Sequence, residues 1–252
     1  RLENTLSEVD IVYAEDTRVA KKLLSHLNLK KEVRSYFKGN EKEKISEILN
    51  LLNKDKSIAM ISDAGTPLIS DPGNMLIKEL IKEKIQIVSI PGPSSVLVAL
   101  TLSGFDIDKF TFFGFVPKAG RERSYFYKTI SELAHPLVCF TSPKRLKKDL
   151  EDFVKNNLEN QVVVCRELTK KFESIYRGNA QELLNDIPTE EYRGEITLVI
   201  DKTKNKSAID INIEELAKKL IMYEVPKREI AKIISSLNNE KVNKIYDSIK
   251  NL

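Results

Sequence analysis

Short runs of β-branched residues alternate with helical patterns along the chain, and this alternation restricts the possible fold more than any other feature. Strands are predicted at Ile11–Ala14, Ser57–Ser62 and Ile85–Ile90. Between the first two, residues 42–53 carry one apolar helical face, made of Ile45, Ile48, Leu49 and Leu52. Strands that alternate with helices form βαβ units, so an α/β fold around a mostly parallel sheet is predicted.

A segment punctuated by glycine and proline, Phe113–Gly120, interrupts this pattern and is the predicted hinge between two domains. Beyond it we expect a second α/β domain, with helices at 121–133 and 143–156 and strands at 137–141, 161–167, 173–177 and 195–201. From about residue 212 the chain is helical and rich in lysine. The predicted organisation is an N-terminal domain (1–114), a second domain (115–207) and a basic helical appendage (208–252).

Composition excludes several classes of protein. The chain has 252 residues, of which 41% are hydrophobic and 31% charged, which is typical of a globular protein of two domains. No apolar run reaches the ~18 residues that cross a bilayer, so no membrane span is expected. The first residues form no apolar signal segment, which favours the cytoplasm and a chain that begins inside a longer gene product. The net charge of +4 permits a polyanionic partner without requiring one.

Two loops that follow predicted strands are the strongest candidates for a ligand site. Residues 62–73 contain two glycines that allow close backbone approach, two prolines that fix the loop, and the carboxylates of Asp63 and Asp71. Pro91–Ser95 leads into an apolar helix whose first N–H groups can receive a polar ligand. In an open α/β sheet these loops would lie side by side at the ligand-binding edge. The alternative for the first loop is an Asp-Pro-Gly turn with capping aspartates.

Other kinds of site are absent from the sequence. There is no P-loop and no GxGxxG after a strand, and no metal-ligand spacing or Ser-His-Asp set is visible. Cys139 and Cys165 lie in apolar runs without a CxxC pattern, which predicts buried thiols. No metal is therefore expected.

Two charged clusters follow strands of the two halves. Glu15–Arg18 reads either as a capped helix start with Arg18 on the surface, or as an arginine presented to an RNA phosphate. Arg166–Lys171 reads either as a structural ion-pair cluster or as part of the site.

Together these motifs resemble the ribosomal RNA small subunit methyltransferase I family, which has the tetrapyrrole-methylase fold. The matching segments are Glu15–Arg18, Ser62–Gly73, Pro91–Ser94, Phe113–Pro117, Arg166–Lys170 and Gly194–Glu195. The resemblance runs from Arg1 to the end of the chain. It departs in one respect, because family members have a strand and a Pro-x-Gly-Asn loop before the helix with which this chain begins.

The resemblance implies two α/β domains that bind S-adenosylmethionine in the cleft between them, and a homodimer. The residues that it assigns to the donor are Asp63, Gly65, Thr66, Leu68, Ser94, Ser95, Phe140, Thr141, Leu168, Glu195 and Thr197. The implied reaction is 2′-O-methylation of the ribose of a cytidine in 16S ribosomal RNA, with the assembled small subunit as the expected partner. The alternatives are a tetrapyrrole (precorrin-type) C-methyltransferase of the same fold and a non-catalytic RNA-binding factor.

Methyl transfer from a sulfonium mainly requires positioning, but a ribose hydroxyl reacts faster if a base withdraws its proton. The candidate bases are Glu15, Asp16 and Glu167, and also Lys170 if its pKa is lowered. Sequence alone does not choose among them. RNA phosphates are expected to contact basic residues near the cleft, namely Arg18, Lys118, Arg121 and Arg123.

Overall fold

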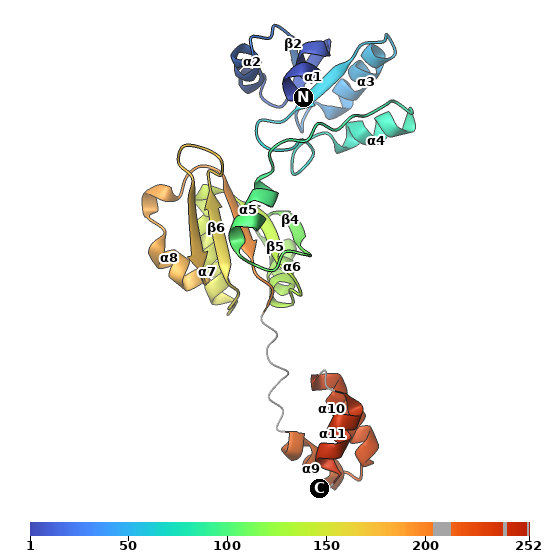
Figure 1. Cartoon of the computed structure of the whole chain (residues 1–252), viewed down its shortest axis with the longest axis vertical. Coiled ribbons are helices and arrows are strands. Elements are labelled where there is room, and N and C mark those ends of the chain that lie inside the picture. The colour runs from blue at the N-terminus through green and yellow to red at the C-terminus, as the bar shows by residue number, and fades with distance from the viewer. Residues whose placement is uncertain (204–212, 239–240, 251) are drawn as a thin grey trace.

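The computed structural model describes residues 1–203, 213–238, 241–250 and 252. Two sheets with their helices follow one another along the chain, and a group of three helices follows the second sheet in sequence (Figure 1). The α/β fold class predicted from the alternating pattern is confirmed.

The first sheet has three parallel strands in the order β2-β1-β3. Its strands are β1 (Ile11–Ala14), β2 (Glu32–Ser35) and β3 (Ile58–Ile61), and its helices are α1 (Leu2–Glu8), α2 (Thr17–His26), α3 (Glu41–Leu52) and α4 (Asn74–Lys82). β1 is buried along its whole length because it lies between the other two strands. The predicted apolar face of α3 packs into the core beneath this sheet. This core fixes the strand ends from which the site is built.

The strand predicted at Ile85–Ile90 is wrong. Residues 85–90 form no strand in the structure, and Ile87 and Val88 are 42% and 59% exposed. A β-branched run becomes a strand only when another strand supplies backbone hydrogen-bond partners. Among the described residues, β3 pairs only with β1, so no strand supplies hydrogen-bond partners to residues 85–90.

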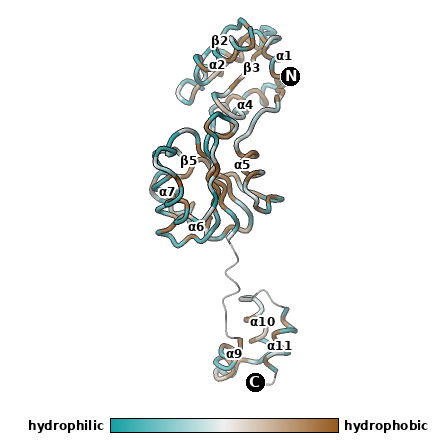
Figure 2. The backbone as a smooth tube through the Cα atoms, turned by 60° about the vertical axis from the view of Figure 1, so that its left-hand side comes forward, coloured by the Kyte–Doolittle hydropathy of each residue, from teal (hydrophilic) through white to brown (hydrophobic). Residues whose placement is uncertain are grey.

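The second sheet has five strands in the order β4-β5-β8-β6-β7 and is mixed rather than mostly parallel. β4 runs parallel to β5, whereas β8 is antiparallel to both β5 and β6, and β6 is antiparallel to β7. The strands are β4 (Thr111–Phe115), β5 (Leu137–Thr141), β6 (Val162–Arg166), β7 (Ser174–Gly178) and β8 (Ile196–Ile200). The three inner strands contain almost only buried residues, and Figure 2 shows apolar segments along the strands of this sheet.

Helices cover both faces of the second sheet. The helices are α5 (Ser95–Ser103), α6 (Gly120–Ser131), α7 (Pro143–Lys155), α8 (Ala180–Asp186) and a short 3-10 turn at Thr189–Glu191. α6, α7 and α8 share one apolar core with the sheet, while α5 packs with the opposite face through Val96, Ala99 and Leu100. Local sequence sets the ends of these helices, since Pro143 occupies the first turn of α7 and Asn179 forms a capping box with Glu182 at α8.

This packing corrects the expected domain boundary. The segment Phe113–Gly120 is not a free hinge, because its first residues belong to β4, which pairs with β5. α5 likewise packs on the second sheet. We therefore place the boundary between α4 and α5, at about residues 83–94, rather than at 114.

Three helices near the C-terminus have an apolar core of their own. They are α9 (Ile213–Met222), α10 (Lys227–Asn238) and α11 (Val242–Ile249). Ala217, Ile230, Ala231, Ile234 and Ile245 are each at most 1% exposed. The start of α10 directly after Pro226 agrees with the sequence pattern. The first residues of the expected appendage, 208–212, lie outside the described residues.

Candidate functional site

The carboxyl ends of β1 and β3 bring two acidic segments together. Because the two strands are parallel neighbours, Glu15 and Asp16 after β1 lie beside Asp63 after β3. The backbone N–H of Asp16 donates a hydrogen bond of 3.1 Å to Asp63 Oδ1. Asp16 also caps α2, since its side chain accepts the N–H of Arg18. This edge is where an open α/β sheet offers a ligand site.

The two glycine- and proline-containing loops meet, as expected, although no strand precedes the second loop. Thr66 Oγ1 in the first loop donates a hydrogen bond of 3.2 Å to the carbonyl of Pro93 in the second. Gly65 has φ +72°, a left-handed conformation that glycine adopts without steric cost. Ser94 is the N-cap residue of α5 but makes no capping hydrogen bond with its side chain. The first N–H groups of α5 therefore stay available to a ligand.

The second sheet contributes its own strand ends to the same place. β5 ends at Thr141, and the chain beyond β6 contains Leu168 and Lys170. β8 runs antiparallel to both strands, so its first residues lie beside their last ones, and Thr197 pairs with both Phe140 and Cys165. One cross-strand row thus gathers residues that are far apart in sequence.

These segments enclose a cavity of about 550 Å³. Every residue assigned to the donor by resemblance lines this cavity except Leu68, whose side chain packs against Gly73 instead. Apolar walls come from both parts of the chain and include Ile69, Val96, Phe115, Phe140 and Leu168. A volume of this size and a mixed lining suit a ligand the size of a nucleoside derivative. Binding by the individual residues stays a prediction.

The polar side of the cavity is acidic. Asp63, Asp71 and Glu195 line it, and Glu15 lies close enough to Asp71 to influence its ionisation. Burial, together with the neighbouring charges of Glu15, Asp63 and Glu195, raises the pKa of Asp71 to about 6. Such a group of carboxylates favours a cationic ligand.

Lys170 is held by two carboxylates at the rim of the cavity. Its Nζ lies 3.1 Å from Glu167 Oε1 and 3.0 Å from Glu195 Oε2. Although burial lowers it, these two partners raise the pKa of Lys170 overall. Glu167 also accepts the backbone N–H of Glu195 at 2.7 Å, and this bond is the main reason that the pKa of Glu167 is lowered. The condition under which Lys170 was a candidate base, a lowered pKa, is therefore not met.

The other predicted polar residues lie outside the cavity lining. Glu15 is exposed, and Asp16 forms a two-pronged ion pair with Arg18, which lowers the pKa of Asp16 to about 2. The Arg18 side chain is 88% exposed. Lys118 and Arg121 are also exposed, in the segment after β4.

The structure corrects the role expected for Arg123. It was expected on the RNA side of the cleft, but its side chain is only 9% exposed and pairs with Asp149 at 2.8 Å and Asp152 at 2.6 Å. It also donates a hydrogen bond to the Pro117 carbonyl and lies over the ring of Tyr127. Its position one turn along the buried face of α6 explains why it binds acidic groups of α7 instead of solvent.

Sequence reasoning noticed Asp71 but assigned it no contact, and it missed Phe115, Cys165 and Ile69. Ile69 and Asp71 belong to the same loop as the predicted donor residues, so their neighbours in sequence could have indicated them. Phe115 and Cys165 sit on strands, where an apolar residue in sequence looks like core. Their place in the cavity depends on the pairing of β4 and β6 in the sheet.

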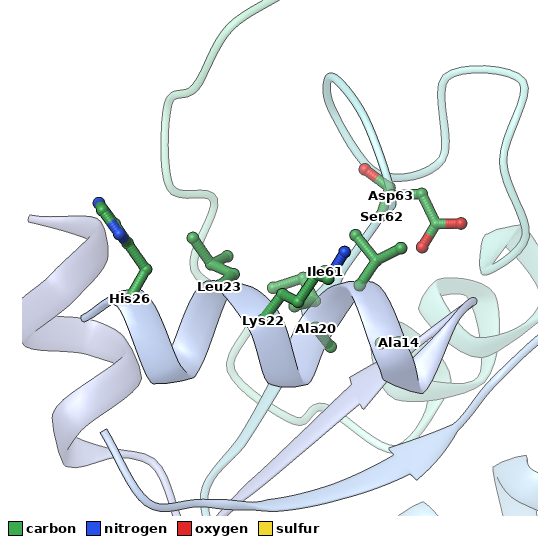
Figure 3. Close-up of a pocket in the computed structure, with 9 residues that line it drawn as sticks. Ala14, Ala20, Lys22, Leu23, His26, Ile61, Ser62 and Asp63 are labelled. Atoms are coloured by element: carbon green, nitrogen blue, oxygen red, sulfur yellow. The ribbon is translucent and has the colours of Figure 1, made fainter. Parts of the chain in front are cut away.

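A second hollow of about 410 Å³ lies along α2 next to the same strand ends. Figure 3 shows Ala20, Leu23 and His26 along this helix, with Ile61, Ser62 and Asp63 at the end of β3. Asp63 lines both hollows, so they adjoin. Within the described part of the chain, no cluster of metal-ligating side chains occurs and no helix is long and apolar enough to span a membrane.

Comparison with known proteins decides what kind of molecule has this cavity. The profile of the tetrapyrrole (corrin/porphyrin) methylases matches residues 1–184. The chain belongs to the tetrapyrrole methylase family. It is a methyltransferase, and S-adenosylmethionine is the methyl donor of this family.

Relatives and solved structures agree with this assignment. The chain is 39% identical over 200 residues to ribosomal RNA small subunit methyltransferase I of Thermotoga maritima, covering 79% of the chain and 90% of that protein. It is 33% identical to the protein of the same name from Vibrio cholerae, covering 98% of the chain and 87% of that protein.

Among solved structures, diphthine synthase superposes with a TM-score of 0.63 at 15% identity, covering 79% of this chain and 82% of the other. Cobalt precorrin-4 methyltransferase gives 0.60 at 17%, covering 79% and 86%. At these identities the structures show the fold alone.

Proposed function

We propose that this methyltransferase transfers a methyl group from S-adenosylmethionine to the ribose 2′-hydroxyl of a cytidine in 16S ribosomal RNA of the small subunit. The cavity between the two sheets is the observation that carries the proposal, because loops from both parts of the chain supply its walls. The relatives named above support the RNA substrate, since they share most of the chain's length.

The lining of the cavity fits the three chemical parts of the donor. Apolar side chains such as Val96, Phe140 and Leu168 suit an adenine ring, which has two faces to bury. The first N–H groups of α5 and the hydroxyls of Ser94 and Ser95 suit polar atoms of the ligand. The nearby carboxylates suit the positive charges of a sulfonium and an ammonium group.

The protein's own part in the reaction is mainly to position two reactants. A sulfonium is already an activated methyl donor, so alignment of the acceptor oxygen with the methyl group supplies most of the required catalysis. The apolar side chains that line the cavity also limit the room for competing water beside the bound reactants. Transfer removes the positive charge from the sulfur, which weakens its attraction to the acidic wall and favours release of the spent donor.

Exposed basic residues near the strand ends are the proposed contacts to RNA phosphates. Arg18 presents a largely exposed guanidinium after β1, and Lys118 and Arg121 follow β4, whose last residue Phe115 lines the cavity. Phosphate contacts of this kind give affinity without reading sequence. We propose a homodimer located in the cytoplasm as the working form, a point that sedimentation velocity on the protein and fractionation of cells would test.

The decisive experiment measures methyl transfer from a radiolabelled donor. Small ribosomal subunits that lack the endogenous modification, naked 16S RNA and a tetrapyrrole serve as three acceptors in parallel. We expect label in the subunits, and nuclease digestion should release it as 2′-O-methylcytidine. Label in the tetrapyrrole alone would contradict the proposal and favour the C-methyltransferase. Donor binding without transfer to any acceptor would favour a non-catalytic RNA-binding factor.

A further inference from the structure

We propose that Asp71 is the base that accepts the proton of the ribose hydroxyl during methyl transfer. This inference rests on the proposed function, and it assigns a catalytic role to a residue that the sequence pattern presented only as a loop carboxylate. The observations that carry it are the position of Asp71 in the donor cavity and the state of the other candidate bases.

Asp71 belongs to the cavity wall. It lines the cavity together with Ser94, Thr141, Lys170 and Glu195, and this cavity is the space that the reactants would share. The loop that presents it is strained, since Leu68 and Ser70 have φ of +75° and +70°. Non-glycine residues in this region are strained and cluster at functional sites. The conformation of this loop therefore lowers the stability of the fold.

Three of the four other candidate bases are already engaged, and the fourth, Glu15, is exposed and lies outside the cavity lining. Asp16 holds Arg18 in a two-pronged ion pair, and Glu167 holds Lys170 together with the N–H of Glu195. Lys170 carries a positive charge between two carboxylates and cannot accept a proton. Within the described residues, Asp71 forms no ion pair, and the nearby Ser62 hydroxyl donates to the carbonyls of Ala64 and Gly65.

The groups that face Asp71 come from every neighbouring element and are mostly acidic. Those that act on its ionisation are Glu15 after β1, Ser62 and Asp63 after β3, and Glu195 before β8. Lys170 after β6 lines the same cavity, and Glu41 of α3 accepts the N–H of Gly73, two residues along the loop, at 3.1 Å. Partial burial and this negative surrounding raise the pKa of Asp71 to about 6. A carboxylate with a pKa near the working pH is both ionised and basic enough to act as a general base.

The proposed step is balanced in atoms and charge. The O–H bond of the 2′-hydroxyl breaks and its proton passes to a carboxylate oxygen of Asp71. The oxygen electron pair forms the new bond to the methyl carbon, while the bond from that carbon to the donor sulfur breaks and its pair stays on sulfur. A carboxylate and a sulfonium become a neutral acid and a neutral thioether. This loss of opposite charges is favourable in a partly apolar cavity, where charged groups are less well solvated than in water, and Asp71 later returns the proton to solvent.

The test compares Asp71→Asn with Asp71→Glu and with a matched control, Asp186→Asn, which changes an exposed carboxylate on α8. Each protein is assayed for methyl transfer to small subunits between pH 5 and pH 8. Binding of S-adenosylhomocysteine is measured by calorimetry. This ligand is chosen because its sulfur carries no charge that the Asp71 carboxylate would attract.

We expect kcat/KM of the unaltered protein to rise with pH and to level off above the pKa of about 6. Asp71→Asn should lower kcat by roughly 100-fold or more and remove this rise, in line with general-base contributions. Affinity for S-adenosylhomocysteine should stay within about 3-fold. Asp71→Glu should regain part of the activity together with a pH-dependent limb, and the control should behave like the unaltered protein.

Two results would overturn the proposal. One is an Asp71→Asn variant that keeps the rise of activity between pH 5 and pH 7, because another group would then titrate. The other is a parallel loss of ligand affinity and activity, which would make Asp71 a donor contact. Failure of the proposed function is distinguishable, since the unaltered protein would then bind S-adenosylhomocysteine but methylate no RNA at any pH.

Discussion

At the residue scale, two arginines of α6, Arg121 and Arg123, have different surroundings and therefore different expected roles. Arg121 is exposed, whereas Arg123 is buried between Asp149 and Asp152 of α7. Asp149 has no exposed side-chain surface, so removal of Arg123 would leave this buried charge with only the longer 3.4 Å contact to Arg145 and the hydroxyl of Thr141. The two residues therefore form a matched pair for testing which basic groups serve RNA.

We predict that Arg123→Ala lowers the free energy of unfolding by about 3 kcal/mol, as expected when a buried ion pair loses one partner. Arg121→Ala should change it by less than about 0.5 kcal/mol, since the side chain is exposed. Urea denaturation measures both values. For RNA binding the order should reverse, and only Arg121→Ala should reduce the slope of log affinity against log salt, by about one unit. A stable Arg123→Ala protein with a reduced slope would contradict the structural role.

Asp71 also affects the dependence of stability on pH. Its ordinary pKa of 3.8 is raised to about 6 in the folded protein. Between these two values the folded state binds more protons than the unfolded state, so the contribution of this group to stability falls as pH rises. Below pH 3.8 the group stabilises the folded state by its full amount relative to neutral pH. Above a pH of about 6 this stabilisation is lost.

We predict that Asp71→Asn raises the melting temperature at pH 7.5, because the neutral amide avoids the cost of a confined charge. The rise from 3.8 to about 6 would correspond to about 3 kcal/mol, and solvent screening of this partly exposed carboxylate reduces the expected gain to about 1–2 kcal/mol. It should shrink as pH falls below 6 and be small near pH 4. Thermal unfolding of both proteins across this range is the measurement. A difference that does not vary with pH would show that Asp71 is not destabilised in the fold.

At the scale of elements, the loop after β3 joins backbone geometry to ligand binding. Gly65 has φ +72° and lines the donor cavity. Gly104, which ends α5, has nearly the same φ of +76°, but a side chain there would meet no atom within 4 Å. A side chain at either glycine would therefore strain the backbone to a similar degree, but only Gly65 lines the cavity.

We predict that Gly65→Val and Gly104→Val each lose about 1–2 kcal/mol of stability, the cost of a side chain in the left-handed region. Only Gly65→Val should weaken binding of S-adenosylhomocysteine, by at least ~10-fold or ~1.4 kcal/mol. Calorimetric titration and thermal unfolding of both variants measure the two effects. Equal losses of affinity would mean that backbone strain, rather than an obstructed cavity, is responsible.

The elements show why part of the fold could be read from sequence. β1, β5 and the apolar face of α3 were predictable because burial leaves a local pattern of apolar residues. Residues 85–90 have the same local pattern but no strand partner in the structure. β2 was missed because Val33 is the only apolar residue of its Glu-Val-Arg-Ser stretch. Strand direction in the second sheet could not be predicted, since pairing between distant segments determines it.

In the candidate site, too, local sequence could indicate some residues and not others. The two loops could be proposed as a ligand site because loops at the ends of strands in an open α/β sheet are where ligands bind, although the same glycines and prolines also fit an ordinary turn. Phe140, Leu168 and Thr197 were reached through family resemblance, since an apolar residue at the end of a strand looks the same whether it faces core or cavity. Burial of Arg123 depends on contact between α6 and α7, which no local pattern reveals.

At the scale of the whole molecule, positive charge is concentrated at the C-terminal end. Residues 204–252 contain ten Lys and Arg against seven Asp and Glu, which is +3 of the chain's net charge of +4. Several of these lysines form exposed pairs along their own helices, such as Lys218 with Glu214 and Lys232 with Glu229. Exposed pairs contribute little to stability, so these lysines can exchange their partners for phosphates at small cost.

The chain offers a natural point at which to separate this region. Thr203 is tied to the second sheet and its helices, because its N–H donates to the Leu133 carbonyl and its hydroxyl donates to the Ile130 carbonyl at 2.7 Å. The helices α9–α11 bury their apolar residues among themselves. A variant that ends at Thr203 should therefore keep both sheets and the cavity.

We predict that this shortened protein binds S-adenosylhomocysteine with unchanged affinity and methylates small subunits less efficiently through a raised KM. The reason is that counterion release from RNA falls with each phosphate contact that is lost. Affinity for 16S RNA should fall, and the slope of log affinity against log salt should decrease by about one unit per lost contact. Replacing Lys227, Arg228 and Lys232 with Gln in the full chain should reproduce part of this loss without deletion. If ligand and RNA affinities fall together in the shortened protein, the three helices support the cavity itself and do not form a separate RNA-binding region.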